Sequence, residues 1–433
     1  MSFMPKTNPD SLAAMRIKLE NFRGIKDVSI GLHPKVTILV GKNGAGKTTI
    51  LDAISLSLQS FNRAWQNATI RGANRKVTRS VQIEKEDIYS SVSEANIYMD
   101  FSAPFQDIFG NGSLRISTRS KISQSSTEYS NLFKTLETAS SVFRKPLFVY
   151  YRQDRMFEMQ SRRQAGSSSI QDELEGDLRA ISHLETWWDQ KDAEEARRVR
   201  DTSETDFRDP QLQAIRSLIQ RVDSFKDIYY SYKSVNPGLY FRKNDNSIVH
   251  ISKLSGGERS YIILLADLAR RLQISYPELD LSEIPGIILI DEIELNLHPL
   301  WQSEIVQTLR EIFKECQFII TTHSPQVISA VSKEHVRIID NRGDGTVVVE
   351  TPLSTRGRTS NYLLEGVFGA TERFPEVDVA ISKFNDAIDM RNEQAAKDLL
   401  DLIQRSVDGS PPDLLVLKKR LKKLMELGRQ SEG

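Results

Sequence analysis

The stretch Val36-Thr37-Ile38-Leu39-Val40-Gly41-Lys42-Asn43-Gly44-Ala45-Gly46-Lys47-Thr48 decides the fold. Its first five residues predict a strand that is buried on both faces. The next eight fit the pattern Gly-x4-Gly-Lys-Thr, and apolar residues between Ile50 and Leu58 then recur at helical spacing. A strand, a glycine-rich loop and a helix in this order are the context of a phosphate-binding loop, so we predict a nucleotide-binding α/β domain.

The loop residues suit a triphosphate that carries a metal ion. Glycines allow backbone N–H groups to converge on phosphate oxygens, and the following helix adds its positive N-terminal end. Lys47 is expected to reach the β- and γ-phosphates, and the Thr48 hydroxyl to bind Mg²⁺. We therefore predict ATP and Mg²⁺ as ligands, with loop contacts from Gly44, Ala45, Gly46, Lys47, Thr48 and Thr49.

The composition excludes several classes of protein. The 433 residues are 39% hydrophobic and 27% charged, which is ordinary for a globular protein of two or three domains. The formal net charge is zero, so nothing global favours nucleic acid or a membrane surface as a partner. The single cysteine, Cys316, excludes an internal disulfide and fits a reducing, cytoplasmic compartment. No apolar run approaches the ~18 residues of a transmembrane helix, so no membrane partner is expected.

Five regions follow from the patterns along the chain. We predict a disordered lead at 1–14, a lobe with the phosphate loop and antiparallel strands at 15–156, a helical insertion at 157–237, a second lobe at 238–353 and a C-terminal helical region at 354–433. Within the insertion, 172–188 and 212–225 have helical patterns. The alternation of strands and helices in the two lobes predicts a core with a mostly parallel sheet.

Two carboxylates follow a second apolar strand, Ile287-Ile288-Leu289-Ile290. Asp291 suits the Mg²⁺ shell, directly or through water, and Glu292 suits polarisation of the attacking water. An apolar strand that ends in Asp-Glu is common in proteins of every kind. Its place after a phosphate loop is what favours the catalytic interpretation over that of an ordinary strand end.

The run Leu254-Ser255-Gly256-Gly257-Glu258 opens a helix. A serine N-cap followed by two glycines leaves a helix N-terminus that a phosphate group of another molecule can approach closely. Glu258 falls in the first turn of this helix. The alternative is an ordinary capped helix start, and the position of the run ahead of the Asp-Glu strand favours nucleotide binding by Ser255, Gly256, Gly257 and Glu258.

Two histidines are candidates for the site. His323 follows the apolar strand Phe318–Thr322, where a neutral imidazole can contact the γ-phosphate region. His298, in Asn296-Leu297-His298-Pro299, suits a contact between two copies or a simple helix-capping role, and both interpretations stay open.

A further residue, usually glutamine, should reach the metal and the water from the interval between the phosphate loop and the insertion. Gln82 and Asp87 both lie in this interval. We take Gln82 as the metal-binding candidate and Asp87 as its alternative.

The chain resembles the ABC-type ATPases of the RecF/SMC branch. The resemblance rests on Leu19-Glu20-Asn21-Phe22-Arg23-Gly24-Ile25, on the run 254–258 and on the segment 291–298, and it extends over roughly 15–105 and 238–350. It implies an ABC-type head that sandwiches each ATP between the phosphate loop of one copy and the Ser-Gly-Gly segment of a second. It also implies that Arg23 and Asn43 join the nucleotide site.

Within this branch, the chain is similar to stand-alone ATPases of bacterial defence islands. Ser255 lies 208 residues after Lys47, too far for a transporter domain and too near for an SMC arm. The segments 291–302, 356–361 and 363–368 resemble PtuA, the ATPase subunit family of Septu antiphage systems, and its retron-associated variants. The resemblance implies an ATP-dependent homodimer or higher oligomer and a separate HNH nuclease subunit as partner.

A nuclease within this chain is not expected. After His323, the acidic turn 340–344 lacks the two-metal pattern of a TOPRIM domain, and HNH-type histidine pairs are absent from the sequence. The alternatives are a RecF-like repair ATPase that clamps DNA and a nucleotide-gated structural protein without hydrolysis. DNA binding would need a local basic surface, for which the sequence offers two clusters: Arg71, Arg75, Lys76 and Arg79, and Arg152, Arg155, Arg162 and Arg163.

Overall fold

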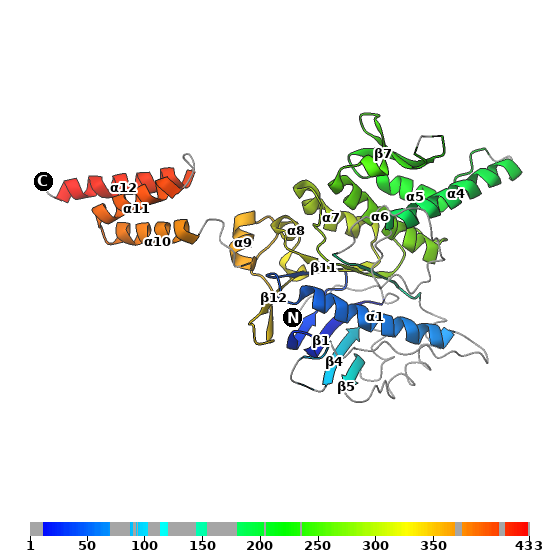
Figure 1. The fold of residues 1–433 in the computed structure, drawn as a ribbon, viewed down its shortest axis with the longest axis horizontal. Helices are drawn as coiled ribbons and strands as arrows, with labels where there is room; N and C mark the ends of the chain where they lie inside the picture. The colour runs from blue at the N-terminus through cyan, green and yellow to red at the C-terminus, as the bar shows by residue number, and fades with distance from the viewer. Residues whose placement is uncertain are drawn as a thin grey trace. The chain divides into compact units, whose positions relative to one another are not determined.

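The computed structural model divides the chain into two compact units, Met1–Ser360 and Asn361–Gly433 (Figure 1). The described residues are 12–69, 87–89, 92, 94–102, 113–119, 144–153, 180–202, 205–233, 236–368, 375–406 and 412–431. Gln82 and seven of the arginines and lysines in the two basic clusters lie outside these residues; only Arg152 lies within them.

A six-stranded sheet forms the centre of the first unit, in the order β13-β12-β3-β11-β10-β6. All neighbouring strands are parallel except β12 and β13. The strands are β3 (Val36–Val40), β6 (Leu147–Tyr151), β10 (Gly286–Ile290), β11 (Cys316–Thr322), β12 (Val336–Asn341) and β13 (Val347–Glu350). Every residue of β3, β6, β10 and β11 is buried, as expected for strands covered on both faces. This arrangement confirms the predicted α/β fold with a mostly parallel sheet.

The strand register places the functional segments at one edge of this sheet. Val40 of β3 pairs with Thr322 of β11, and Ile290 of β10 pairs with both Ile320 and Tyr151. Because these strands are parallel and in register, the residues that follow each of them emerge side by side. The phosphate loop and the segments after 151, 290 and 322 therefore share one edge.

An antiparallel sheet in the order β2-β1-β4-β5 packs beside the central one. Its strands are β1 (Ala14–Phe22), β2 (Ile25–Gly31), β4 (Glu94–Phe101) and β5 (Ser113–Arg119). Helix α1 (Lys47–Thr69) contacts β4, β5 and β11, and one apolar core joins the helix to both sheets (Figure 1). The residues at 12–14, placed in the lead by sequence, are buried here. The Ala14 N–H donates to Gln317 Oε1 at 2.8 Å, which ties the start of the chain to β11.

The region between the two halves of the central sheet combines helices with a small sheet. Helices α4 (Ala180–Thr202) and α5 (Pro210–Ile219) precede the antiparallel strands β7 (Phe225–Ser231), β8 (Gly238–Lys243) and β9 (Ile248–His250). The predicted helical insertion therefore ends differently from expectation, since α5 stops at Ile219 and β7 follows. The reason is the pairing of Phe225–Ser231 with β8. Phe225 and Ile228 are buried three residues apart, as on a helix face, because the strand has a register shift between Phe225 and Asp227.

Helices of the second half cover the central sheet. Helix α6 (Gly256–Ser275) contacts α4, α5 and α7 (Pro299–Ile312), and the short helix α8 (Pro325–Ser329) follows β11. Fourteen residues of α6 are buried, from Ser260 to Gln273, so this helix lies inside the unit along most of its length.

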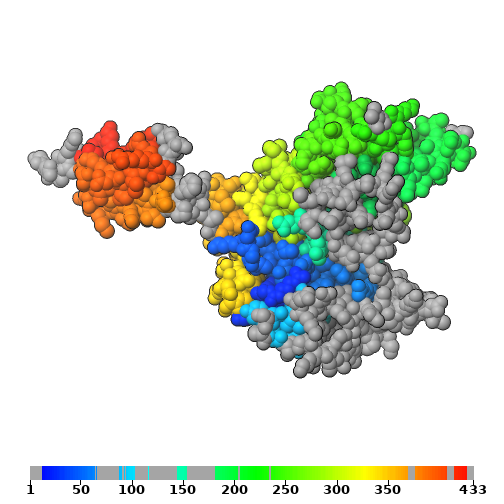
Figure 2. Space-filling model, viewed as in Figure 1, coloured from blue at the N-terminus to red at the C-terminus, as the bar shows by residue number. Residues whose placement is uncertain are grey.

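The second unit has a core of its own. After α9 (Ser360–Phe368), the helices α10 (Pro375–Asp389), α11 (Glu393–Ser406) and α12 (Pro412–Ser431) pack around buried Phe384, Ala396, Ile403 and Leu414. They form the orange to red body in Figure 2. Among the described residues, no helix is long and apolar enough to cross a membrane.

Two histidines meet at the start of β3, where the chain enters the central sheet. The rings of His33 and His335 stand edge to face with centroids 4.3 Å apart. Burial, together with the charges of the neighbouring His335, Arg310 and Arg337, lowers the pKa of His33 from 6.5 to about 4. The Lys35 N–H donates to His33 Nδ1 at 3.1 Å, which needs an unprotonated acceptor.

This pair predicts an acid-sensitive stability. In the unfolded chain, His33 takes up its proton near pH 6.5, whereas in the folded chain it does so only near pH 4. The stability gained by keeping His33 neutral is therefore present above pH 6.5 and is lost as the pH falls towards 4. We expect His33→Asn, which keeps an acceptor oxygen, to remove about 2 kcal/mol of the loss between pH 7.5 and 4.5. Urea unfolding at both pH values measures it, and an unchanged pH dependence in the variant would contradict the assignment.

Candidate active site

The phosphate loop has a backbone that favours glycine at three positions. Gly41 has φ +157°, Gly44 has φ +78° and Gly46 has φ +97°. A Cβ at Gly41 would collide with the carbonyl oxygen of Ile339 on β12, so the loop begins directly against that strand. Helical hydrogen bonding starts with the Ile50 N–H, which donates to the Gly46 carbonyl at 3.0 Å. The earlier N–H groups at the N-terminus of α1 are therefore those that an anion can use.

Lys47 lies inside the loop. Its side chain is 7% exposed, and Nζ donates to the carbonyls of Gly41 and Lys42, each at 3.1 Å. Burial lowers the pKa of Lys47, while the charges of the nearby carboxylates at 291, 292 and 294 act in the opposite direction. The loop thus holds a desolvated ammonium group that gains by contact with a phosphate.

Asp291 joins the loop helix to two strands of the central sheet. The Thr48 hydroxyl donates to Asp291 Oδ2 at 2.8 Å, and the Thr321 hydroxyl donates to Asp291 Oδ1 at 2.5 Å. The Asp291 N–H donates to the carbonyl of Tyr151 at 2.8 Å. A hydroxyl and a carboxylate oxygen side by side are the hard oxygen donors that Mg²⁺ prefers, so Thr48 and Asp291 fit the predicted metal.

Glu292 stands in a strained backbone conformation. Its φ of +47° lies in the left-handed region, which is uncommon for a residue other than glycine. The Glu292 N–H donates to Thr321 Oγ1 at 2.7 Å, so Thr321 holds both members of the Asp-Glu pair. Strain of this kind persists only where the surroundings fix it, and it is frequent at catalytic sites.

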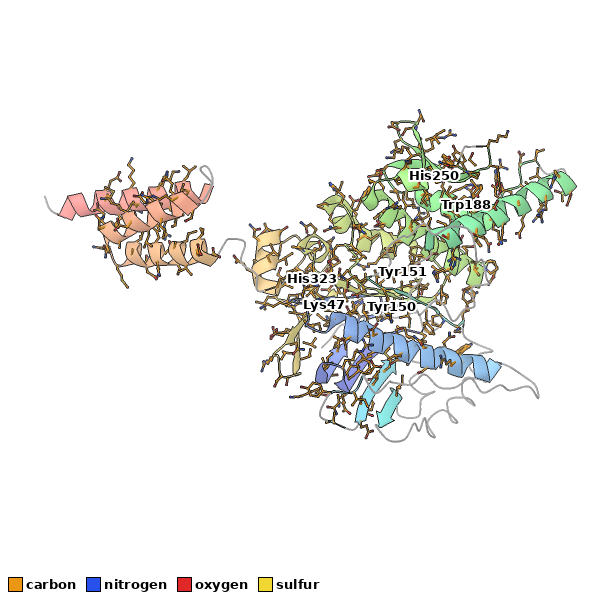
Figure 3. All side chains as sticks on the ribbon, viewed as in Figure 1. Lys47, Tyr150, Tyr151, Trp188, His250 and His323 are labelled. Carbon is orange, nitrogen blue, oxygen red and sulfur yellow. The ribbon has the colours of Figure 1, made fainter. Side chains whose placement is uncertain are left out.

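A third carboxylate, Glu294, holds the histidine that follows β11. Glu294 accepts a hydrogen bond from the Thr322 hydroxyl at 2.8 Å and one from the His323 N–H at 2.5 Å. Burial, aided by the charge of Lys47, lowers the pKa of His323, so its imidazole is neutral at neutral pH. Figure 3 shows Lys47 and His323 close together at this edge. The sequence pointed to His323 but missed Thr321 and Glu294, whose only signal was a polar end on an apolar strand.

The Ser-Gly-Gly segment caps α6 and is exposed. Ser255 and Glu258 form a reciprocal capping box, with Glu258 N–H to Ser255 Oγ at 3.2 Å and Ser255 N–H to Glu258 Oε2 at 3.0 Å. Lys243 Nζ donates to the other Glu258 oxygen at 2.7 Å. Glu258 is thus engaged within its own chain, and its predicted nucleotide contact stays a prediction. Ser255 and Gly256 remain exposed at the surface.

Gly257 brings a second exposed segment against the start of α6. A Cβ at Gly257 would lie 3.0 Å from the Asn296 carbonyl oxygen and 3.4 Å from both the His298 nitrogen and a ring carbon of Trp301. His298 is the N-cap of α7 and accepts from the Leu300 N–H at 3.3 Å. The structure therefore gives His298 the capping role, and a contact to a second copy remains a prediction.

Arg23 occupies the turn between β1 and β2 and pairs with two carboxylates. Its guanidinium donates to Asp52 at 2.5 Å and to Asp87 at 2.7 Å. Asp52 lies one helical turn beyond Thr48 on α1, and it also accepts from the Tyr150 hydroxyl at 3.0 Å. Asp87 is thus held by Arg23, which explains why it is a poor candidate for the metal. Arg152 also pairs with Asp52, at 3.4 Å.

Gln153 is a glutamine that the sequence reasoning overlooked. It comes two residues after β6, and the final residue of β6, Tyr151, pairs with Ile290, the residue before Asp291. Gln153 therefore leaves the sheet at the same edge as the Asp-Glu pair. The available signal was the short apolar run Leu147–Tyr151 before it, because polar residues at the end of an apolar strand had already marked Asp291 and His323.

Comparisons with known proteins find a matching family profile and several similar chains. The profile of a protein family described as "AAA domain, putative AbiEii toxin, Type IV TA system" matches residues 36–329. The chain is 28% identical to the Retron Ec83 probable ATPase of Escherichia coli, over 83% of this chain and 77% of that protein. It is 22% identical to the Septu protein PtuA of Bacillus thuringiensis, over 88% and 91% of the two chains. A solved structure of an SMC head bound to the C-winged helix domain of ScpA aligns with 79% of this chain and 98% of its own chain. The two are 18% identical, with a TM-score of 0.46.

Proposed function

The chain belongs to the AAA-domain family whose profile matches residues 36–329 and is an ATPase, and we propose that it works by closing two copies around ATP. One observation carries the proposal. Lys47, Asp291 and His323 meet at one edge of the central sheet, whereas Ser255 lies exposed at the start of α6 and bonds only within its own segment in the described structure. An exposed, capped helix start with two glycines supports its use by the phosphate of a second copy.

The geometry supports a division of labour in hydrolysis. The N–H groups of the loop and Nζ of Lys47 bind the phosphates, with Nζ exchanging two carbonyl acceptors for phosphate oxygens. Thr48 and Asp291 would hold Mg²⁺, which would supply positive charge against the phosphates. Glu292 accepts a hydrogen bond from the attacking water and polarises it. The neutral imidazole of His323 donates towards the γ-phosphate.

Thr321 keeps these parts in place. Its hydroxyl donates to Asp291 and accepts from the Glu292 N–H, so one side chain fixes the metal ligand and the base relative to each other. Gln153, rather than Gln82, takes the glutamine role in this proposal, because it follows the strand next to the one that ends at Asp291.

The biological role follows from the relatives. Similarity to a retron ATPase and to a Septu PtuA protein supports a place in antiphage defence. The chain then acts as an ATP-controlled sensor and scaffold, and a separate HNH nuclease subunit does the cutting. Gene neighbourhood separates this role from that of a RecF-like DNA clamp, since an adjacent HNH gene favours defence and adjacent replication genes favour repair.

Glu292→Gln tests the proposed base. We expect ATP binding to persist, because Lys47 and Thr48 remain, and hydrolysis to fall by about 100-fold or more, because the water loses its polarising carboxylate. Single-turnover hydrolysis measures the rate, and light scattering with ATP should detect a trapped dimer or higher oligomer. Glu283→Gln, at an exposed carboxylate ahead of β10, is the control. Hydrolysis at the normal rate in Glu292→Gln would exclude Glu292 as the base.

Ser255→Arg tests the shared site. The added bulk and charge should leave nucleotide binding by the separate chain intact and abolish ATP-dependent association and turnover. Ser217→Arg places the same group at an exposed serine on α5 and should behave as wild type. Light scattering with and without ATP measures the association. If turnover per chain is unchanged in Ser255→Arg, ATP is not shared between copies.

Gln153→Ala and Gln82→Ala decide which glutamine serves the metal and the water. We expect Gln153→Ala to lower kcat about tenfold, as for the loss of one hydrogen bond to a charged group, and to raise the Mg²⁺ concentration needed for half-maximal rate. Gln82→Ala should change neither quantity. The opposite pattern would restore Gln82 to the role.

A further inference from the structure

A buried cluster of charges ties helix α6 to the end of β6. Asp267, 0% exposed, accepts hydrogen bonds from Arg270 Nη2 at 2.7 Å, from Arg271 Nε at 2.7 Å and from the Tyr151 hydroxyl at 2.9 Å. Burial opposes ionisation of this carboxyl, but the two guanidinium groups outweigh it and hold the pKa of Asp267 well below its usual range. Asp267 is therefore ionised, and both of its oxygens accept hydrogen bonds.

Such a cluster is a poor source of stability. Removing an aspartate and two arginines from water costs free energy that their mutual attraction only partly returns, and apolar residues of similar size often do as well. What the cluster provides is a fixed geometry between two elements, since each oxygen of Asp267 has directed donors.

Tyr151 is hydrogen-bonded both through its side chain and through its backbone. Its hydroxyl binds Asp267 on α6, and its backbone carbonyl accepts the Asp291 N–H at 2.8 Å. One residue thus touches both the helix that begins with Ser255 and the aspartate that fits the metal. Gln153 follows two residues later.

The neighbouring Tyr150 reaches the other face of the sheet. Successive side chains of a strand point to opposite faces. The Tyr150 hydroxyl donates to Asp52 on α1 at 3.0 Å, one turn beyond Thr48. The end of β6 is therefore bonded to the helix of the phosphate loop on one side and to α6 on the other, and Figure 3 labels both tyrosines between these helices.

We propose that Tyr151 is a positioning residue that couples the start of α6 to the nucleotide edge of the same chain. The inference rests on the proposed shared site, in which Ser255 touches the nucleotide of the second copy. Ser255 lies about 18 Å along α6 from Asp267, and a buried helix moves as a rigid element over that distance. A shift at Asp291 or Gln153 on nucleotide binding therefore moves Ser255 through Tyr151 and Asp267, and the two sites of a dimer sense each other.

Tyr151→Phe tests the coupling, because it keeps the ring and removes only the hydroxyl donor. We expect kcat to fall about tenfold and cooperativity in ATP to disappear, while the affinity of the separate chain for a fluorescent ATP analogue stays unchanged. The control is Tyr276→Phe at the C-cap of α6. Its hydroxyl donates to the Lys145 carbonyl at 2.6 Å, before β6 begins, so it removes a comparable bond between the same two regions at the end away from the nucleotide edge.

The variants distinguish a failure of the Tyr151 coupling from a failure of the shared ATP site. Normal kcat and normal cooperativity in Tyr151→Phe would overturn the coupling. An equal loss of kcat and cooperativity in Tyr276→Phe would also overturn it, because both variants would then act through a general loss of stability. Urea unfolding of both variants compares their stabilities directly. Ser255→Arg reports on the shared site alone. If it abolishes association while Tyr151→Phe behaves as wild type, the shared site stands and the coupling falls.

Discussion

The carboxylate of Asp291 is the constraint on which the rest of the site depends. It is 1% exposed, and a buried anion is costly unless hydrogen bonds surround it. Thr48 and Thr321 donate to its two oxygens, and its N–H is bonded to Tyr151. The two bonds to the carboxylate come from α1 and β11, and the N–H of the same residue adds β6, so one residue fixes the relative positions of three elements. The same oxygens are those that suit a divalent cation.

The sequence was informative wherever the chemistry lies in consecutive residues. The phosphate loop, the Asp-Glu pair and the histidine after β11 each belong to one short segment with an apolar strand before it, and each was predicted from that segment. Thr321, Glu294 and Gln153 were missed because their importance comes from pairing between strands that are far apart in the chain. The β7 strand was missed for a related reason, since its burial depends on β8 and is invisible in a helical window.

The family resemblance and the structure give Arg23 different partners. The resemblance places this arginine at the nucleotide, whereas the structure pairs it with Asp52 and Asp87. Both can hold in one protein, because Asp52 lies on the loop helix one turn beyond Thr48. The turn that carries Arg23 has left-handed backbone at both Asn21 and Arg23, a conformation that is uncommon for residues other than glycine. Asp87, the acidic alternative for the metal, pairs with Arg23.

The absence of a side chain at Gly257 has a consequence for the proposed pairing of two copies. Because the backbone of Asn296–His298 and the ring of Trp301 lie against that glycine, the exposed start of α6 and the exposed start of α7 form one continuous surface. Neither segment can change its shape without disturbing the other. In the proposed shared site, two related chains in one cell would avoid forming mixed assemblies by altering both segments together, so orthogonality between paralogues is expected to evolve in paired steps.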